Sequence, residues 1–134
     1  QWLAVTGSVN QLGEIQPIGG VNEKIEGFFA SCRARGLTGH QGVIIPLRNT
    51  RHLALNRDVV EAVERGEFGI YAVSEVEEAL ELLTGVPAGE RQPDGTYPEN
   101  TLYGRVARRV GEMAKIVAAW GGPNKQLAIE SSGH

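Results

Sequence analysis

Two adjacent glycines, Gly19-Gly20, separate an extended segment of the chain from a helical one, and this constrains the fold more than any other feature. Before the pair, residues 2–9 and 14–18 are two short extended runs. Residues 10–13 between these runs have the composition of a hairpin turn. The sequence therefore predicts a hairpin whose second strand is broken at the glycine pair, where a helix begins.

The expected helix carries an apolar stripe that starts at Ile25 and continues through Phe28, Phe29 and Cys32, and Gly36 is expected to end it. Lys24 falls in its first turn, near unsatisfied amide donors that disfavour a cation, although Glu23 offsets part of this effect. If Phe28 also desolvates the amine, both effects favour the neutral form that a general base needs. The alternative is a structural lysine whose stem covers apolar surface while its head reaches water.

Four short motifs in this region match a known family in order and spacing. They resemble the C-terminal half of the proteolytic domain of Lon-type ATP-dependent proteases: Thr6-Gly7, Gly13-Glu14, Pro17-Ile18-Gly19-Gly20 and Asn22-Glu23-Lys24. The following helix and the hydrophobic strand at residues 42–46 fit the same family. The likeness extends through Gly85 and is closest to the divergent Lon-like branch, and residues 86–113 look like that branch's own C-terminal extension.

The resemblance implies a serine-lysine dyad, in which a serine attacks the peptide carbonyl and a lysine is its general base. On the matching positions, Lys24 takes the role of the base. Thr6 is similar to the family threonine whose hydroxyl helps to orient that lysine. Gly19 and Gly20 match glycines that let the backbone pass close to the site.

The nucleophile of the dyad is not found in this sequence. In the family, the serine lies a few dozen residues before the lysine, and here only Ser8 precedes Lys24. Ser8 stands where relatives often carry an acidic residue, so we interpret it as a strand or turn hydroxyl. The sequence also begins inside an expected strand. We therefore expect a fragment of a longer protein, with little or no peptidase activity by itself.

Strands and helices are expected to alternate through the rest of the first part of the chain. After the strand at residues 42–46, a capping box from Asp58 to Glu61 predicts a helix that Gly66 could close. Residues 68–73 are a second strand candidate, and a capping box from Ser74 to Glu77 leads into a helix that ends before Gly85. Residues 1–85 are thus predicted to form an α+β domain with a small mixed sheet and packed helices, similar to a Lon proteolytic domain.

The remaining residues divide into three parts. Residues 86–99 form an irregular connection rich in glycine and proline. Residues 100–122 are expected to form a long C-terminal helix, capped by Asn100 or Thr101. Residues 123–134 are a tail whose end, Ser131 to His134, resembles the start of an engineered affinity tag and is excluded from functional reasoning.

The C-terminal helix has an apolar stripe formed by Leu102, Val106, Val110, Met113, Val117 and Trp120. This stripe packs either on its own domain or on another subunit. Its basic residues form a solvated face or meet an acidic neighbouring subunit; they are Arg105, Arg108, Arg109 and Lys115.

Composition and spacing argue against several other functions. The formal net charge of −3 gives no electrostatic case for nucleic acid, and no apolar run reaches the length of a membrane span. Cys32 is the single cysteine, so it can form no intramolecular disulfide, and we expect a cytoplasmic protein. His40, His52 and His134 lack metal-ligand spacing, so no metal site is predicted. No phosphate-binding loop occurs, and ATP is expected on a separate module.

Three hypotheses remain. The leading one is a fragment of a Lon-like serine endopeptidase that acts on unfolded or extended polypeptide. The resemblance to the family implies a homo-oligomer, with a hexamer as the expected form. The second is a non-catalytic Lon-like scaffold, as in the domain appended to a bacterial DNA-repair ATPase, but similar domains of that kind lack the lysine that stands here at Lys24. The third is a small interaction domain that binds partners through the C-terminal helix.

Overall fold

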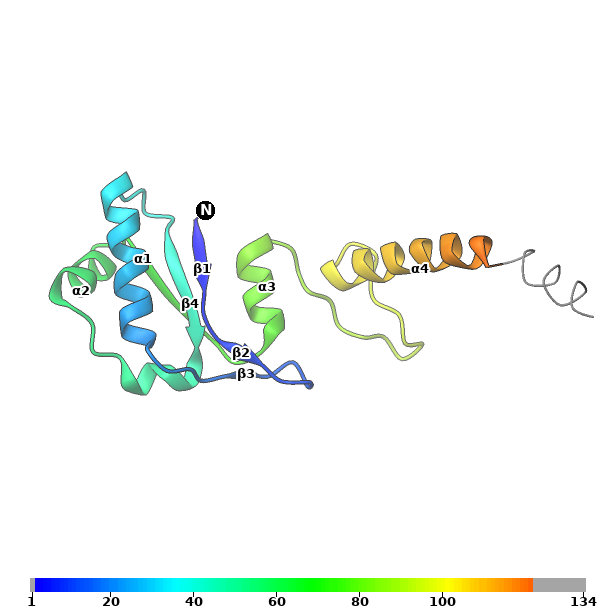
Figure 1. Cartoon of the computed structure of the whole chain (residues 1–134), viewed down its shortest axis with the longest axis horizontal. Coiled ribbons are helices and arrows are strands. Elements are labelled where there is room, and N and C mark those ends of the chain that lie inside the picture. Colours follow the sequence, from blue (N-terminus) through cyan, green and yellow to red (C-terminus); the bar gives the residue numbers. More distant parts are fainter. Residues whose placement is uncertain (1, 122–134) are drawn as a thin grey trace, which may run out of the picture. The chain divides into compact units, whose positions relative to one another are not determined.

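The computed structural model describes residues 2–121. These residues fall into two compact units, and the boundary in the sequence lies between Gly85 and Val86. The first unit contains a parallel sheet with the strand order β1-β4-β5, where β1 is Leu3–Val5, β4 is Gly42–Pro46 and β5 is Gly69–Val73 (Figure 1). A separate antiparallel pair is formed by β2 (Ser8–Val9) and β3 (Ile15–Gln16).

Helices connect and cover the parallel strands. Helix α1 (Val21–Arg35) links β1 to β4, and the 3-10 helix η1 (Leu47–His52) and α2 (Arg57–Glu64) link β4 to β5. Helix α3 (Val76–Thr84) follows β5. Parallel strands need such crossover connections because the chain must return to the starting end of the sheet.

The central strand β4 is buried along its whole length and organises two apolar clusters. Val43 and Ile45 pack with α1 and α2 on one side of the sheet. Ile44 points to the other side, where it packs with Val73 and with Ala79 of α3. The continuous apolar run of β4 is therefore explained by a strand that has a helical layer on each face.

The α+β fold with a small sheet, packed helices and a C-terminal helix is confirmed, and β4 has the predicted bounds. The predicted mixed sheet is instead a parallel sheet and a separate antiparallel pair, because β2 and β3 bond to each other and not to β1, β4 or β5. The single extended run predicted over residues 2–9 is wrong, because β1 and β2 belong to different sheets. The chain leaves the parallel sheet at Gly7, where a side-chain Cβ would lie 3.4 Å from Pro46 Cγ.

The helix starts differ slightly from the predicted capping boxes. Helix α2 begins at Arg57, and the Asp58 to Glu61 box does not form, because Glu61 Oε1 accepts from Arg57 Nε at 2.7 Å. At α3, the backbone N–H of Ser74 donates to Glu78 Oε2 at 2.8 Å, so Glu78 has the role predicted for Glu77. These starts depend on which carboxylate reaches a free amide, and charged residues at adjacent positions compete for that contact.

In the second unit, residues 86–101 form an irregular segment that ends at α4 (Leu102–Trp120). The Thr101 hydroxyl caps the helix by accepting from Gly104 N at 3.2 Å. The backbone amides of Leu102 and Tyr103 donate to Pro87 O and Ala88 O, each at 2.9 Å. Inside this described unit, α4 has no buried residue, and its apolar stripe is exposed. The predicted tail at residues 123–134 lies outside the described residues.

Candidate active site

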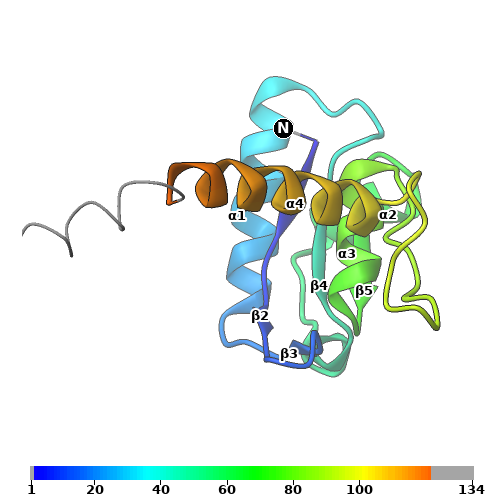
Figure 2. The same cartoon turned by 90° about the vertical axis from the view of Figure 1, so that its right-hand side faces the viewer.

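The two predicted site residues, Thr6 and Lys24, belong to elements that meet at one edge of the first unit. β1 ends, α1 begins, and the β2–β3 hairpin and η1 lie at this edge (Figures 1 and 2). A crossover helix runs antiparallel to the strands it connects, so its first turn lies near their carboxyl ends. Thr6 directly follows β1, and Lys24 is the fourth residue of α1. In open parallel sheets, ligands bind at the carboxyl edge.

Gly20 sets the direction in which α1 starts. It is the N-cap residue and has φ 68° and ψ 29°, in the left-handed region that favours glycine. The backbone N–H of Lys24 donates to Gly20 O at 3.1 Å, which closes the first helical turn. The glycine pair predicted to break the extended run therefore turns the chain directly into the helix that carries the lysine.

The environments of Thr6 and Lys24 are different. Thr6 is half-buried, and its backbone N–H donates to Ile44 O at 3.0 Å. The Lys24 side chain is exposed, so the expected desolvation against Phe28 is not found; Phe28 instead packs with the first core cluster. Among residues 2–121, Lys24 forms no salt bridge. The chain leaves the amine accessible to a partner group.

Two asparagines hold the chain at this edge; the sequence reasoning missed Asn49 and gave Asn22 no role beyond its place in a motif. Asn49 of η1 is 3% exposed, and its amide makes two hydrogen bonds to the main chain of Ile18: Nδ2 donates to Ile18 O at 2.9 Å, and Oδ1 accepts from Ile18 N at 3.0 Å. Asn22 of α1 donates from Nδ2 to His52 O at 3.0 Å and accepts from Ala54 N at 2.9 Å. These contacts span about thirty residues of chain and leave no local sequence signal.

The hairpin is tied to the same edge through the junction of β5 and α3. Ile15 N donates to Ser74 O at 2.7 Å, and Val76 N donates to Gly13 O at 2.9 Å. A cavity of about 160 Å³ lies between the hairpin, η1 and this junction, and Arg48 and Glu75 are among its lining residues. The carboxyl edge therefore has a small polar hollow beside the elements that carry Thr6 and Lys24.

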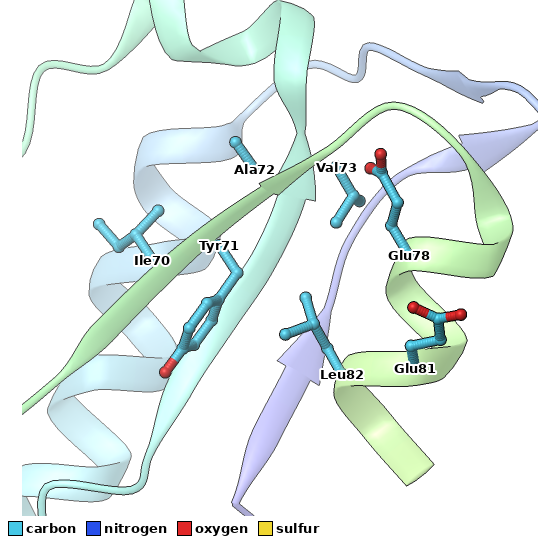
Figure 3. Close-up of a pocket in the computed structure, with 7 residues that line it drawn as sticks. All are labelled: Ile70, Tyr71, Ala72, Val73, Glu78, Glu81 and Leu82. Atoms are coloured by element: carbon cyan, nitrogen blue, oxygen red, sulfur yellow. The ribbon is translucent and has the colours of Figure 1, made fainter. Parts of the chain in front are cut away.

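A larger cavity of about 630 Å³ lies elsewhere, between β5 and α3 (Figure 3). Tyr71 and Leu82 are among its lining residues, and none of the lining residues belongs to β1, α1 or η1. Size alone would select this larger cavity as the candidate active site. The chemistry predicted from the sequence is at the other location.

Elsewhere in the described part of the chain, the structure gives no better candidate for a nucleophile or a metal site. Ser8 is exposed in β2, opposite Gln16. Burial raises the pKa of the Cys32 thiol, so this thiol is kept in its protonated, unreactive form. Within residues 2–121, no group of three His, Cys, Asp or Glu side chains could hold a metal ion. The described helices also include none with the length and apolar character needed to cross a bilayer.

Comparison with known proteins identifies relatives of this chain. A protein from Escherichia coli named "Putative Lon protease homolog" is 61% identical over 121 residues, which cover 90% of this chain and 20% of that protein. A protein of the same name from Haemophilus influenzae is 46% identical over 110 residues, covering 82% of this chain and 18% of that protein. The "Archaeal Lon protease" of Thermococcus kodakarensis is 38% identical over 82 residues, covering 61% of this chain and 11% of that protein.

The chain thus spans about a fifth of the length of the first two relatives. Residues 1–85, which are the first compact unit, match the family model described as the Lon protease (S16) C-terminal proteolytic domain. This match includes the whole carboxyl edge, from Thr6 through Lys24 to Asn49. The α/β unit that brings these residues to one edge therefore belongs to the Lon protease proteolytic-domain family.

Proposed function

We propose that this chain is the lysine-bearing part of a serine endopeptidase that uses a serine-lysine dyad. The observation that carries the proposal is the placement of Lys24, which a left-handed Gly20 delivers to the carboxyl edge, in a chain of the Lon protease family. Thr6 ends the neighbouring strand at the same edge and is the proposed orienting hydroxyl. Both residues lie at positions that match the family's motifs.

In this mechanism, Lys24 acts as a general base towards a serine from outside the chain. The neutral Nζ accepts the serine proton while Oγ attacks the peptide carbonyl, and the resulting ammonium can then protonate the leaving amine. An ammonium has no lone pair, so the lysine must be in its neutral form to act as a base, and water around the side chain favours the charged form. We propose that the serine-bearing segment and the bound polypeptide cover Lys24 and remove this water. The present chain alone is then inactive.

A non-catalytic scaffold is the alternative function. The exposure of Lys24 is the observation that favours it, because a lysine with a purely structural role keeps its charged head in water. In that case the first unit would serve assembly, and Lys24 would be replaceable. The two functions differ in the effect of removing the amine.

The substitution Lys24→Ala in the intact protein separates these functions. We expect hydrolysis of an unfolded protein substrate to fall by about 10²- to 10⁴-fold, the usual contribution of a general base, while folding and any ATP hydrolysis remain. Arg35→Ala removes an exposed positive charge from the last turn of the same helix, so it is the matched control and should hydrolyse normally. Hydrolysis retained in Lys24→Ala would remove Lys24 from the base role. An intact, folded protein without any hydrolysis would favour the scaffold.

The remaining features of the intact protein are proposals of the same kind. The substrate is unfolded or extended polypeptide, ATP is bound by a separate module, and the protein works in the cytoplasm. A basic patch that could hold nucleic acid is not part of the proposal, because acidic residues outnumber Lys and Arg sixteen to thirteen.

We also propose that α4 contacts a second copy of the chain. Within its own unit, no residue of α4 is buried, so its apolar stripe needs a partner outside that unit. α4 carries four basic residues and one acidic residue, so two α4 helices repel each other. Residues 1–85 hold eleven acidic and seven basic residues and attract such a helix. A contact between α4 of one copy and the first unit of the next is head-to-tail, and contacts of this kind can close into a ring.

A further inference from the structure

The strongest unexplained contact in the described chain is the one between Asn49 and Ile18. The Asn49 amide is 3% exposed and uses both its donor and its acceptor on the main chain of a single residue, with distances of 2.9 and 3.0 Å. This is the hydrogen-bond pattern of a neighbouring strand, supplied here by one side chain. A buried amide that is bonded through both its nitrogen and its oxygen in this way specifies one local geometry, since a shift leaves these polar groups without partners.

The contact acts at the point where the chain is least constrained by itself. Ile18 is followed by Gly19 and Gly20, and glycines restrict backbone directions less than other residues do. The direction in which α1 leaves the hairpin therefore depends on what holds the residues before and after the pair. Asn49 holds the residue before it. Asn22, the second residue after the pair, is bonded to His52 O and Ala54 N and holds the first turn of α1.

Both ties lead to the same element. Asn49 and His52 belong to η1, and Ala54 follows it by two residues. η1 continues directly from β4, the buried central strand, so it has a rigid support. Lys24 lies two residues after Asn22 and has its own backbone bond to Gly20 O. The lysine is thereby connected to the core of the unit on both sides of the flexible glycine pair.

We propose that Asn49 is a positioning residue for the Lys24 amine. Asn49 holds Ile18, and Ile18 in turn fixes the glycine turn and the first turn of α1. In this position, the Lys24 Nζ can reach a serine hydroxyl. This proposal rests on the peptidase function proposed above. A general base must lie within about 2.6–3.2 Å of the proton it takes, and a displacement of about 1 Å can lower the rate about 100-fold. Asn49 itself touches neither substrate nor serine.

The first test is kinetic and uses the intact protein. Asn49→Leu keeps a side chain of similar size in the buried site and removes both hydrogen bonds. We expect kcat for peptide hydrolysis to fall by about 10- to 100-fold, with little change in KM, because the misplaced group acts on the chemical step. Two controls are needed. Arg51→Ala changes an exposed residue of η1, and Val59→Ala weakens the core at a buried residue of α2.

Both controls should keep their kcat at temperatures where they are folded. An Asn49→Leu variant with the kcat of Val59→Ala at matched folded fraction would overturn the positioning role. If Lys24→Ala hydrolyses normally in the same assay, the dyad itself fails, and with it the kinetic part of the proposal.

The second test is independent of activity and of any failure of the dyad. Hydrogen exchange of the present chain reports the Ile18 and Lys24 amides directly. In Asn49→Leu, we expect the Ile18 amide, which donates to Asn49 Oδ1, to exchange at least about tenfold faster, followed by the Lys24 amide. The amides of β4 should be unchanged. Unaltered protection at both positions would show that Asn49 does not hold the turn.

Discussion

Lys24 and Thr6 are held by the fold in different ways. The Thr6 backbone is fixed to β4 through Ile44 O, and its short side chain has little freedom. The Lys24 backbone is fixed by the first turn of α1, but its amine is at the end of a long, exposed side chain with many rotamers. A lysine of this kind needs a neighbouring group to select one orientation. In the proposed site, the Thr6 hydroxyl is that group.

The substitution Thr6→Val tests this role, because valine has nearly the same shape and lacks the hydroxyl. A hydrogen bond to a charged group contributes about 1.5–3 kcal/mol, which corresponds to roughly a 10- to 100-fold loss of kcat/KM. We expect this loss in peptide hydrolysis by the intact protein, smaller than the loss in Lys24→Ala. Thr50→Val, at an exposed position of η1, is the control. An unchanged rate in Thr6→Val would make Thr6 a purely structural residue.

At this scale, the sequence predicted where Lys24 lies but not what surrounds it. The glycine pair and the following apolar period are local signals, so they place the lysine in the first turn of a helix. The expected desolvation by Phe28 failed because Phe28 turns towards the core, where its ring lies 6.3 Å from that of Phe68. Asn49 could not be predicted either, because nothing local distinguishes a buried, paired asparagine from one in a polar loop.

Among the elements, β4 and β5 approach each other unusually closely at their first residues. Gly42 and Gly69 are paired in register, and Tyr71 lies beside both. A Cβ on Gly42 would be 2.5 Å from Gly69 O and 2.8 Å from Tyr71 Cε2. The backbone oxygen cannot move without disturbing the ladder. Glycine is therefore required at the start of β4 for packing, whereas a Cβ on Gly27 would meet nothing within 4 Å.

Two glycine substitutions should have opposite effects for this reason. Gly42→Ala should destabilise the chain by about 1–3 kcal/mol through overpacking. Gly27→Ala, in α1 where a Cβ meets nothing within 4 Å, should stabilise it by about 0.5–1 kcal/mol. Urea unfolding followed by circular dichroism measures both free energies of unfolding. A Gly42→Ala variant as stable as the original chain would show that the two strands are not held in this close register.

Whole elements were predicted better than their ends. β4 is a continuous apolar run between a glycine and a proline, and these signals fix both of its bounds. The extended run at residues 2–9 is divided between two sheets because its two halves have different partners. β1 pairs with β4, which is distant in sequence, and β2 pairs with β3 across the hairpin turn. The predicted capping boxes differ from the observed contacts because Glu61 and Glu78 each bond to a residue four positions earlier, whereas a capping box requires a spacing of three.

At the scale of the whole molecule, the two units differ in how far their apolar side chains are buried. Residues up to Gly85 enclose two apolar clusters around the sheet. In contrast, Val106, Val110, Met113 and Val117 of α4 are each at least half exposed. An exposed row of this length on one helix is typical of a surface that contacts another chain. In the proposed contact, that chain is a second copy, and the basic α4 and the acidic residues 1–85 have complementary charges.

Sedimentation equilibrium of the present chain tests the second copy. We expect self-association that weakens as salt is raised, since screening reduces the attraction between a basic helix and an acidic unit. Val110→Asp should reduce the association strongly, because it places a charge in the apolar stripe. Ala119→Asp adds the same charge on the opposite side of α4 and should have little effect. A chain that stays monomeric at every concentration and salt would exclude this contact.

The contact between Asn49 and Ile18 also has a consequence for how freely position 18 can vary. Asn49 bonds only to the N–H and C=O groups of Ile18, which nearly every amino acid possesses. Substitutions at position 18 can therefore change the side chain without disturbing this recognition, provided that the half-buried volume is filled. Proline is the exception, because it has no N–H to donate. The turn before Lys24 is thus held through the main chain of residue 18, and the side chain at this position can vary between related sequences.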